Sequence, residues 1–220
     1  MKHVALILSG SGRADGSEIH ESVCALLALS QHDLPVRMYA PDIEQFRVMN
    51  HLSGRMTEES RNVLVEAARI ARGNITPLSE LQPKDVSAIL LPGGIGAAAN
   101  LWAYAQDGIR GEVEPEVYRV LTTAMRDQIP LGFICIAPVL GARIAHALGK
   151  SLTLTIGTDS NTAADIESLG CKHQLSNVSE CVVDIENKVV STAAYMSAKN
   201  IAECFSGISA LVKEIKSMIS

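Results

Sequence analysis

Ile129-Pro130-Leu131-Gly132-Phe133-Ile134-Cys135-Ile136-Ala137-Pro138 is the stretch that decides the fold, because it joins a buried strand directly to a helix. The continuous apolar run Leu131 to Ile134 is typical of a strand that is covered on both faces. Gly132 leaves room there for a close neighbour. Pro138 suits the first turn of a helix, where an N–H group has no partner within the helix. The stretch therefore predicts a strand, a tight turn at Cys135 and a helix.

Cys135 is the candidate nucleophile at this turn. A side chain at a strand-to-helix corner is presented at the carboxyl edge of the sheet, and the positive end of the following helix favours thiolate over thiol. The thiolate is the nucleophilic form of cysteine. The alternative that stays open is a small buried hydrophobic residue, which is what most free cysteines are.

Strands and helices alternate along most of the chain, which indicates a doubly wound, mainly parallel α/β sheet with helices on both faces. We expect one domain over residues 1–220. Further strands are predicted at Val4 to Leu8, Val36 to Ala40, Val86 to Leu91 and Leu152 to Ile156, with a short one around Phe46 to Met49 in an irregular 43–56 segment. Cys181 to Ile185 and Lys188 to Thr192 predict a β-hairpin outside the parallel sheet or at its edge.

The helices are predicted from capping residues and apolar spacing. Ser17 is expected to cap the first helix, with Ile19, Val23, Leu26 and Leu27 on its inner side, and Thr57 to cap a helix that runs to Arg72. The others are expected at Gly96 to Leu101, Glu116 to Arg126, the cysteine corner to about Leu148, Asn161 or Thr162 to Gly170, and Ser197 to Ile219.

Composition narrows the class of protein. The chain has 220 residues, of which 47% are hydrophobic and 20% charged, with a net charge of −5 and no block of like charges. Nothing in this balance predicts binding to nucleic acid or to a membrane. Five scattered cysteines without a C-x-x-C pair argue against a disulfide framework and a structural zinc site. The N-terminal apolar run is too short for a signal peptide, so we expect a cytosolic protein.

The N–H groups that a nucleophilic site needs to hold an oxyanion are expected at the same edge of the sheet. Gly93 and Gly94 end the strand at Leu91, and the N–H of Gly94, together with that of Ile136, could hold an oxyanion. Read alone, Pro-Gly-Gly is equally a simple turn.

Two glutamates of the first helix are candidates for the carboxyl group beside the cysteine. Glu18 and Glu21 lie three residues apart, and a carboxyl beside a thiolate tends to be protonated, so that it could donate to sulfur and shuttle a proton. Both could instead simply complement the helix dipole. His20, between them, is a candidate for lining the pocket or a partly buried structural histidine.

The strand ending in Leu-Pro-Gly-Gly, the segment Gly132-Phe133-Ile134-Cys135-Ile136-Ala137-Pro138 and the acidic first helix resemble the ThiJ/PfpI superfamily, and most closely its ElbB-type members. These are described as enhancing lycopene biosynthesis, an isoprenoid pathway, and as glyoxalases. The resemblance also rests on Asp15 to Glu21, Asn50 to Leu52, Arg61 to Leu64, Thr155 to Asp159 and Ala194 to Met196.

The resemblance implies a class I glutamine amidotransferase-like, flavodoxin-like sandwich and a homodimer. It implies Cys135 as nucleophile, Glu21 as its carboxyl partner with Glu18 one turn earlier, and Gly94 and Ile136 as oxyanion amides. The expected reaction is a cofactor-independent glyoxalase III-like conversion of glyoxal, or a related 2-oxoaldehyde, to the 2-hydroxy acid. Several glyoxalase members have a histidine beside or after the cysteine; here Ile136 follows it, and no Cys-His-Glu triad is visible.

Three other functions are weighed against this one. A glutamine amidotransferase would need a His-x-Glu pair downstream, and neither His146 nor His173 begins one. A dehydrogenase is suggested by Tyr195-x-x-x-Lys199, but the glycine loop after the first strand has the wrong spacing for a dinucleotide. An oxidation sensor with little turnover, based on Cys135, stays open.

Overall fold

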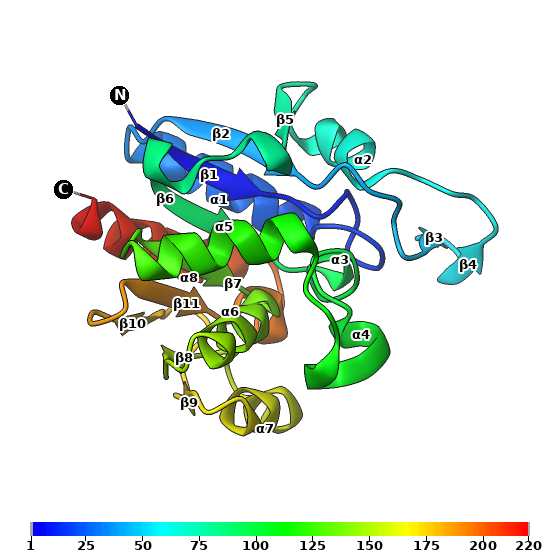
Figure 1. Cartoon of the computed structure of the whole chain (residues 1–220). Helices are drawn as coiled ribbons and strands as arrows, with labels where there is room; N and C mark the ends of the chain where they lie inside the picture. The colour runs from blue at the N-terminus through cyan, green and yellow to red at the C-terminus, as the bar shows by residue number, and fades with distance from the viewer. Residues whose placement is uncertain (1, 220) are drawn as a thin grey trace.

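The computed structural model describes residues 2–219 and is built around a seven-stranded sheet with the order β10-β11-β7-β6-β1-β2-β5 (Figure 1). All neighbouring strands in this sheet are parallel except β10, which is antiparallel to β11. The strands are β1 His3–Ile7, β2 Val36–Ala40, β5 Ile75–Pro77, β6 Val86–Leu91, β7 Leu131–Ile134, β10 Val182–Asp184 and β11 Val189–Thr192. The predicted doubly wound α/β fold is confirmed.

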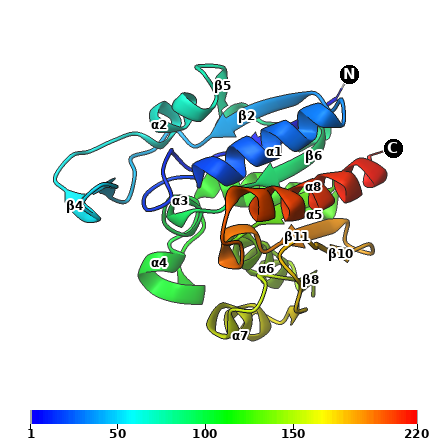
Figure 2. The ribbon, with the colours of Figure 1, turned by 180° about the vertical axis from the view of Figure 1, so that it is seen from behind.

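Helices cover both faces of the sheet. Figure 1 shows α5 and α6 in front of it, and Figure 2, from behind, shows α1 and α8 lying side by side on the other face. The helices are α1 Ile19–Gln31, α2 Val63–Ile70, α3 Ile95–Ala99, α4 Tyr104–Asp107, α5 Pro115–Arg126, α6 Ala137–Ala147, α7 Ser160–Ser168 and α8 Ile201–Met218. Within the described residues, no helix is long and apolar enough to cross a membrane.

A hydrophobic core lies on each face of the sheet, because the side chains of each strand alternate between the two faces. Successive side chains of a strand point to opposite faces. In β1, Ala5 and Ile7 therefore pack with α5 and α6, whereas Val4 and Leu6 pack with α1 and α8. Both groups are fully buried, which explains why the strand shows a continuous apolar run instead of alternation.

The central stretch folds as predicted. β7 ends at Ile134, Cys135 occupies the turn, and α6 begins at Ala137. Gly132 faces α8, where a Cβ would lie 3.0 Å from Leu211 Cδ2. The absence of a side chain at Gly132 thus lets α8 pack closely against the middle of the sheet.

The C-terminal strands differ partly from expectation. The predicted hairpin forms, and its second strand β11 joins the main sheet parallel to β7, so that only β10 lies at the edge. The strand predicted at Leu152 to Ile156 is only β8 Thr153–Leu154, and it pairs with β9 Lys172–His173 in a separate small sheet. β5 and β9 were not predicted, since each is only two or three residues long.

The helix predicted from Thr57 to Arg72 is wrong in its first part. Thr57 ends β4 Arg55–Thr57, which pairs with β3 Val48–Asn50 in a hairpin that projects from the body (Figure 1). The helix starts at Val63, where the Asn62 side chain accepts a hydrogen bond from Val65 N–H at 3.0 Å. Residues 61–63 instead bond the backbone of residues 43–45, so a tertiary pairing overrides local helix propensity.

Of the four residues predicted for the inner face of α1, only Leu26 packs against the core. Ile19, Val23 and Leu27 are 43%, 48% and 47% exposed, and the buried positions include Cys24, Ala25, Ala28 and Leu29. Small side chains let α1 lie close to the sheet and to α8, so the larger apolar residues are left outside. Apolar periodicity alone could not distinguish these two stripes.

Candidate active site

Cys135 sits at the turn between β7 and α6 in a left-handed backbone conformation with φ of 63°. This conformation costs a non-glycine residue about 1–2 kcal/mol, so the surrounding structure has to hold it. The Cys135 N–H donates to the Thr192 carbonyl at 2.9 Å, which anchors the turn to the end of β11. The residue is 8% exposed and reaches a cavity at the carboxyl edge of the sheet.

Glu21, in the first turn of α1, is the carboxyl partner of the cysteine. Its side chain is fully buried and hydrogen bonds the Cys135 thiol. Oε2 accepts from Gly93 N–H at 2.9 Å and Oε1 accepts from Tyr195 N–H at 3.2 Å. Three segments that are distant in sequence therefore hold this carboxyl beside the sulfur.

The turn after β6 supplies the amide groups. The N–H groups of Gly94 and Ile136 face the Cys135 sulfur, which is the arrangement expected of an oxyanion site. At Gly93 a Cβ would lie 2.5 Å from Cys135 Cβ and 2.9 Å from Glu21 Oε2. Only glycine fits between the two reactive side chains.

The protonation of the pair differs from the thiolate that was expected. Burial, and then the negative charge of Glu21, raise the pKa of the Cys135 thiol well above its ordinary value, although the amides of Gly94 and Ile136 act in the opposite direction. Burial also raises the pKa of Glu21 to about 7. The cysteine is therefore a thiol at neutral pH, beside a carboxyl that can take or give a proton near pH 7. The expected tendency of the carboxyl toward protonation is confirmed in direction.

Glu18 and Ser17 take structural positions near the site. The Glu18 side chain accepts from Glu21 N–H at 2.7 Å and caps α1, the role that was expected of Ser17. Ser17 Oγ instead accepts from Ser9 N–H at 2.8 Å within the loop after β1. Of the two candidate glutamates, only Glu21 contacts the sulfur by hydrogen bonding, although Glu18 also lines the cavity.

The cavity above Cys135 has a volume of about 540 Å³. His20 lines it, as the sequence suggested, and its Nδ1 lies 2.8 Å from the Tyr195 hydroxyl. Tyr195 belongs to the Ala194 to Met196 segment of the resemblance and was given no role at the site; here its hydroxyl contacts His20 and its N–H donates to Glu21. The other lining residues are Arg13, Glu18, Gly94, Ile95, Ile136 and Met196.

Arg13, Ile95 and Met196 were not predicted. Each comes from a different loop or helix start at the same sheet edge, and no local motif marks them. The topological rule that ligands bind outside the carboxyl ends of parallel strands would have directed attention to the loop carrying Arg13.

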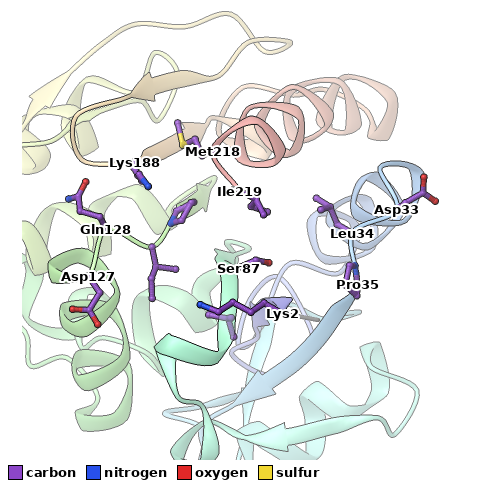
Figure 3. Close-up of a pocket in the computed structure, with 13 residues that line it drawn as sticks. Lys2, Asp33, Leu34, Pro35, Ser87, Asp127, Gln128, Lys188, Met218 and Ile219 are labelled. Atoms are coloured by element: carbon purple, nitrogen blue, oxygen red, sulfur yellow. The ribbon is translucent and has the colours of Figure 1, made fainter.

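A second cavity, of about 530 Å³, lies at the opposite edge of the sheet (Figure 3). Its lining includes Lys2, Pro35, Ser87, Pro130 and Lys188, which lie where five parallel strands begin. No cysteine, histidine or glutamate lines it. The cavity at Cys135 is therefore the candidate active site.

The histidines considered for a glutaminase triad lie elsewhere. His146 Nδ1 contacts the Leu169 carbonyl at 3.1 Å, and His173 Nε2 accepts from Ile156 N–H at 3.3 Å. Neither lines the cavity at Cys135. In residues 2–219, no group of three or more His, Cys, Asp or Glu side chains is placed to hold a metal ion.

Comparison with known proteins finds curated relatives in mammals and fish. The chain is 42% identical over 222 aligned positions to the ES1 protein homolog of Rattus norvegicus, which covers 96% of this chain and 82% of the rat protein. It is equally 42% identical to the glutamine amidotransferase-like class 1 domain-containing protein 3 of Homo sapiens, and 29% identical to the ES1 protein of Danio rerio. No family model matches the sequence.

Solved structures agree with this result. An isoprenoid biosynthesis protein with an amidotransferase-like domain from Ehrlichia chaffeensis superposes with a TM-score of 0.93 at 29% identity, over 100% of both chains. A ThiJ/PfpI domain protein from Brachyspira murdochii, at 15% identity, gives a TM-score of 0.58 over 99% of both chains and shares the fold. The ThiJ/PfpI-type fold implied by the resemblance is confirmed.

The expected cytosolic location is contradicted by the same relatives. The rat, human and zebrafish proteins are each named mitochondrial. The expectation rested on the scattered cysteines and on the shortness of the N-terminal apolar run, which are criteria for secretion and do not test for mitochondrial targeting.

Proposed function

The chain belongs to the ES1 family, and from that premise we propose that it is a cofactor-independent glyoxalase that converts glyoxal or a related 2-oxoaldehyde to the 2-hydroxy acid. The observation that carries the proposal is the buried pair of Cys135 thiol and Glu21 carboxyl, with two backbone N–H groups at the sulfur and an open cavity above it. A small aldehyde is the substrate that this cavity would present to the sulfur.

Addition of the thiol to the aldehyde begins the reaction. The Cys135 sulfur attacks the aldehyde carbon while Glu21, as carboxylate, accepts the thiol proton. The resulting alkoxide is stabilised by Gly94 N–H and Ile136 N–H and then takes the proton back from Glu21. A neutral hemithioacetal is formed, and Glu21 is a carboxylate again.

Proton transfer between the two carbons follows. Glu21 removes the proton from the former aldehyde carbon, which gives an enediolate, and returns it to the neighbouring carbon. The proton of the hemithioacetal hydroxyl passes to the second oxygen, which gives a 2-hydroxy thioester. Water hydrolyses the thioester and releases the thiol of Cys135. The sum is one 2-oxoaldehyde plus one water to one 2-hydroxy acid. A pKa near 7 suits Glu21 for both directions of transfer.

His20 and Tyr195 are assigned to the substrate's second oxygen. Their side chains are hydrogen bonded to each other and line the cavity with Cys135. Within the pair one group donates to the other, so either His20 Nε2–H or the Tyr195 O–H is left to donate to the oxygen that becomes the hydroxyl group. They occupy the functional position of the histidine that is missing from the cysteine corner.

The test is product analysis with glyoxal and methylglyoxal. Cys135→Ser is expected to lose conversion to glycolate and lactate, and Glu21→Gln to lower kcat by about 100-fold or more. Cys181→Ser, which removes a cysteine outside the cavity, serves as the matched control and is expected to keep full activity. Full glycolate production by Cys135→Ser would exclude the mechanism.

The same assay separates two rival functions. Steady turnover far above that of a free thiol would distinguish an enzyme from an oxidation sensor that uses Cys135. The relatives' amidotransferase-like name makes glutamine the second substrate to test. Release of ammonia from glutamine by the wild type, lost in Cys135→Ser, would replace the aldehyde proposal with a glutaminase.

A further inference from the structure

Arg13 is an unpaired cation at the mouth of the cavity that holds Cys135. Within residues 2–219, its guanidinium takes part in none of the ion pairs, whereas those of Arg61, Arg69 and Arg119 each face a glutamate. A guanidinium with free donors presents a fork that matches a carboxylate. It is the cavity residue with the chemistry to recognise an anion.

The backbone on both sides of Arg13 is fixed. The Arg13 carbonyl accepts from Ile95 N–H at 2.8 Å, which ties the loop to the start of α3. The next carbonyl, of Ala14, accepts from Arg47 Nε at 3.3 Å and Nη2 at 3.2 Å, and Ala14 N–H donates to His51 Nε2 at 3.3 Å. Tertiary contacts therefore fix the backbone of the loop that carries Arg13, and its side chain is exposed at the cavity.

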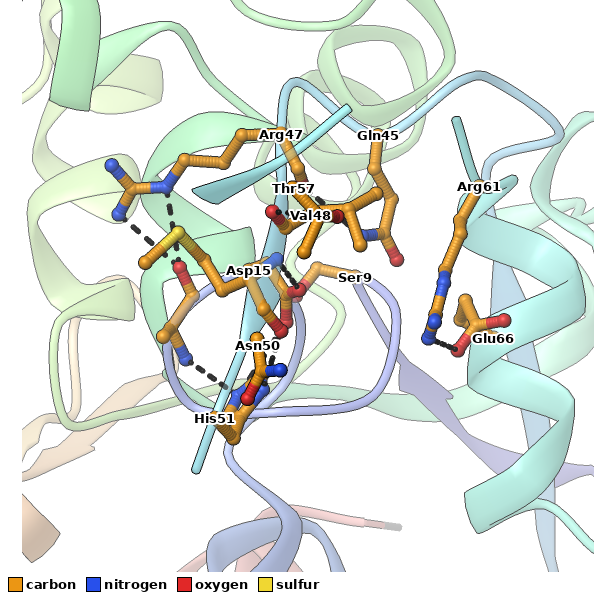
Figure 4. Close-up of polar contacts among 12 residues, drawn as sticks. Ser9, Asp15, Gln45, Arg47, Val48, Asn50, His51, Thr57, Arg61 and Glu66 are labelled. Atoms are coloured by element: carbon orange, nitrogen blue, oxygen red, sulfur yellow. Dashed lines mark hydrogen bonds and ion pairs between the residues drawn. The ribbon is translucent and has the colours of Figure 1, made fainter. Parts of the chain in front are cut away.

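Asp15 completes the attachment of this loop to the segment before β4. Its Oδ2 accepts from Met49 N–H at 2.7 Å, and its Oδ1 lies 3.6 Å from His51 Nε2 (Figure 4). Figure 4 shows Arg47 and His51 beside this loop, where both bind the Ala14 backbone. Arg13 lines the cavity.

The other charged groups of the cavity are compatible with this role. The Glu18 carboxylate accepts from Glu21 N–H at the start of α1, and His20 is bonded to Tyr195. Ile95, Ile136 and Met196 give the cavity an apolar wall. The cavity thus combines one nucleophile with one cation that has no protein partner in the described chain.

We propose that Arg13 binds the carboxylate of the substrate, so that the preferred substrate is a 2-oxoaldehyde carrying a carboxylate tail. This inference rests on the proposed function for the reaction, and on the cavity alone for the anion preference. The reacting carbonyl lies at Cys135 and the tail extends to the mouth of the cavity. Because Arg13 contacts this tail and not the reacting carbonyl, it is a specificity residue.

The first test needs no turnover. Iodoacetate and iodoacetamide are close in size and differ in charge, and both alkylate Cys135 with loss of iodide. The ratio of their rates at the Cys135 peptide, read by mass spectrometry, is expected to fall by about 3–5-fold in Arg13→Gln, as for loss of a partly exposed ion pair. Arg13→Lys should keep most of the ratio. Arg126→Gln, on an exposed arginine at the end of α5, is the matched control and should keep all of it.

The second test uses 4,5-dioxopentanoate and its methyl ester, which differ in the tail charge. Wild type is expected to favour the acid in kcat/KM, and Arg13→Gln to lower kcat/KM for the acid more than for the ester, so that the preference is lost. An unchanged alkylation ratio in Arg13→Gln, an equal fall in Arg126→Gln, or failure of both reagents to reach Cys135 would overturn the proposal. If the alkylation ratio falls in Arg13→Gln as expected but no aldehyde is turned over, the glyoxalase function is excluded and the anion site is supported.

Discussion

At the scale of single residues, the site depends on the protonation of the Cys135 thiol and the Glu21 carboxyl. Both groups are buried, and negative charge in that space is unfavourable, so the pKa of each group is raised. Glu21 is kept beside the sulfur by the N–H groups of Gly93 and Tyr195. In the folded chain, Glu21 therefore binds a proton more tightly than it does in the unfolded chain.

This proton should be visible in the pH dependence of stability. Between pH 4.5, where the unfolded carboxyl titrates, and about 7, the folded chain holds a proton on Glu21 that the unfolded chain has lost. The stabilisation is complete below pH 4.5 and disappears as the pH rises through about 7, with a magnitude on the order of 3 kcal/mol. Urea unfolding of wild type and Glu21→Gln at pH 5 and pH 8 measures it.

Glu21→Gln removes this titration, so the comparison isolates it from other groups. The free energy of unfolding of wild type is expected to fall between the two pH values by more than that of Glu21→Gln. Parallel behaviour of the two proteins would show that Glu21 titrates normally.

At the scale of elements, the turn between β6 and α3 connects the site. Gly93 N–H donates to Glu21, its carbonyl accepts from Glu18 N–H at 3.0 Å, and Gly94 N–H faces the sulfur. One tripeptide turn therefore positions the carboxyl, the start of α1 and part of the oxyanion site. Short loops between rigid elements are the usual carriers of such chemistry.

Gly93→Ala is expected to disable the site without unfolding the protein. The added Cβ would lie 3.0 Å from Cys135 Sγ and closer still to Glu21 Oε2, so the two groups must separate. A displacement of about 1 Å in a catalytic geometry can cost roughly 100-fold in rate. Glyoxal turnover, with circular dichroism as a measure of folding, tests this.

The control for Gly93→Ala is Gly54→Ala in the turn of the β3–β4 hairpin. A Cβ there meets no atom within 4 Å, although the φ of 68° makes alanine less favourable by about 1 kcal/mol. It should lose stability and keep activity. Full activity of Gly93→Ala would show that the Cys135–Glu21 contact is not required.

At the scale of the whole molecule, α1 has two roles. Its buried side carries Glu21 and the small residues that pack on α8, and its outer side presents Ile19, Val23 and Leu27 to solvent. Three apolar side chains in line on one exposed helix face are the feature expected of a subunit interface. The homodimer expected from the family resemblance would cover them.

Val23→Glu tests this expectation. We expect the wild type to sediment as a dimer and Val23→Glu to shift toward monomer, with the dissociation constant raised by about 10-fold or more because a charge would be buried at the interface. Val65→Glu, on an exposed valine of α2, is the control and should stay dimeric. A monomeric wild type, or a dimeric Val23→Glu, would contradict the assignment of this face.

The class of fold and the position of the nucleophile could both be predicted from the amino-acid sequence. The apolar run of β7, the turn at Cys135 and the start of α6 are consecutive in the chain, so local propensity and patterning were enough to find them. The same holds for Gly93 and Gly94, which directly follow a buried strand.

The groups that surround the cysteine, and their protonation, depend on contacts that form only in the folded chain. Glu21 rather than Glu18 contacts the sulfur because the carboxyl is fixed by amides from two other parts of the chain, and burial, which no sequence pattern measures, raises its pKa. Tyr195 and Arg13 reach the cavity through loops that meet only when parallel strands align their carboxyl ends. Contacts between residues so far apart in sequence leave no local signal, and for that reason the site could be completed only in three dimensions.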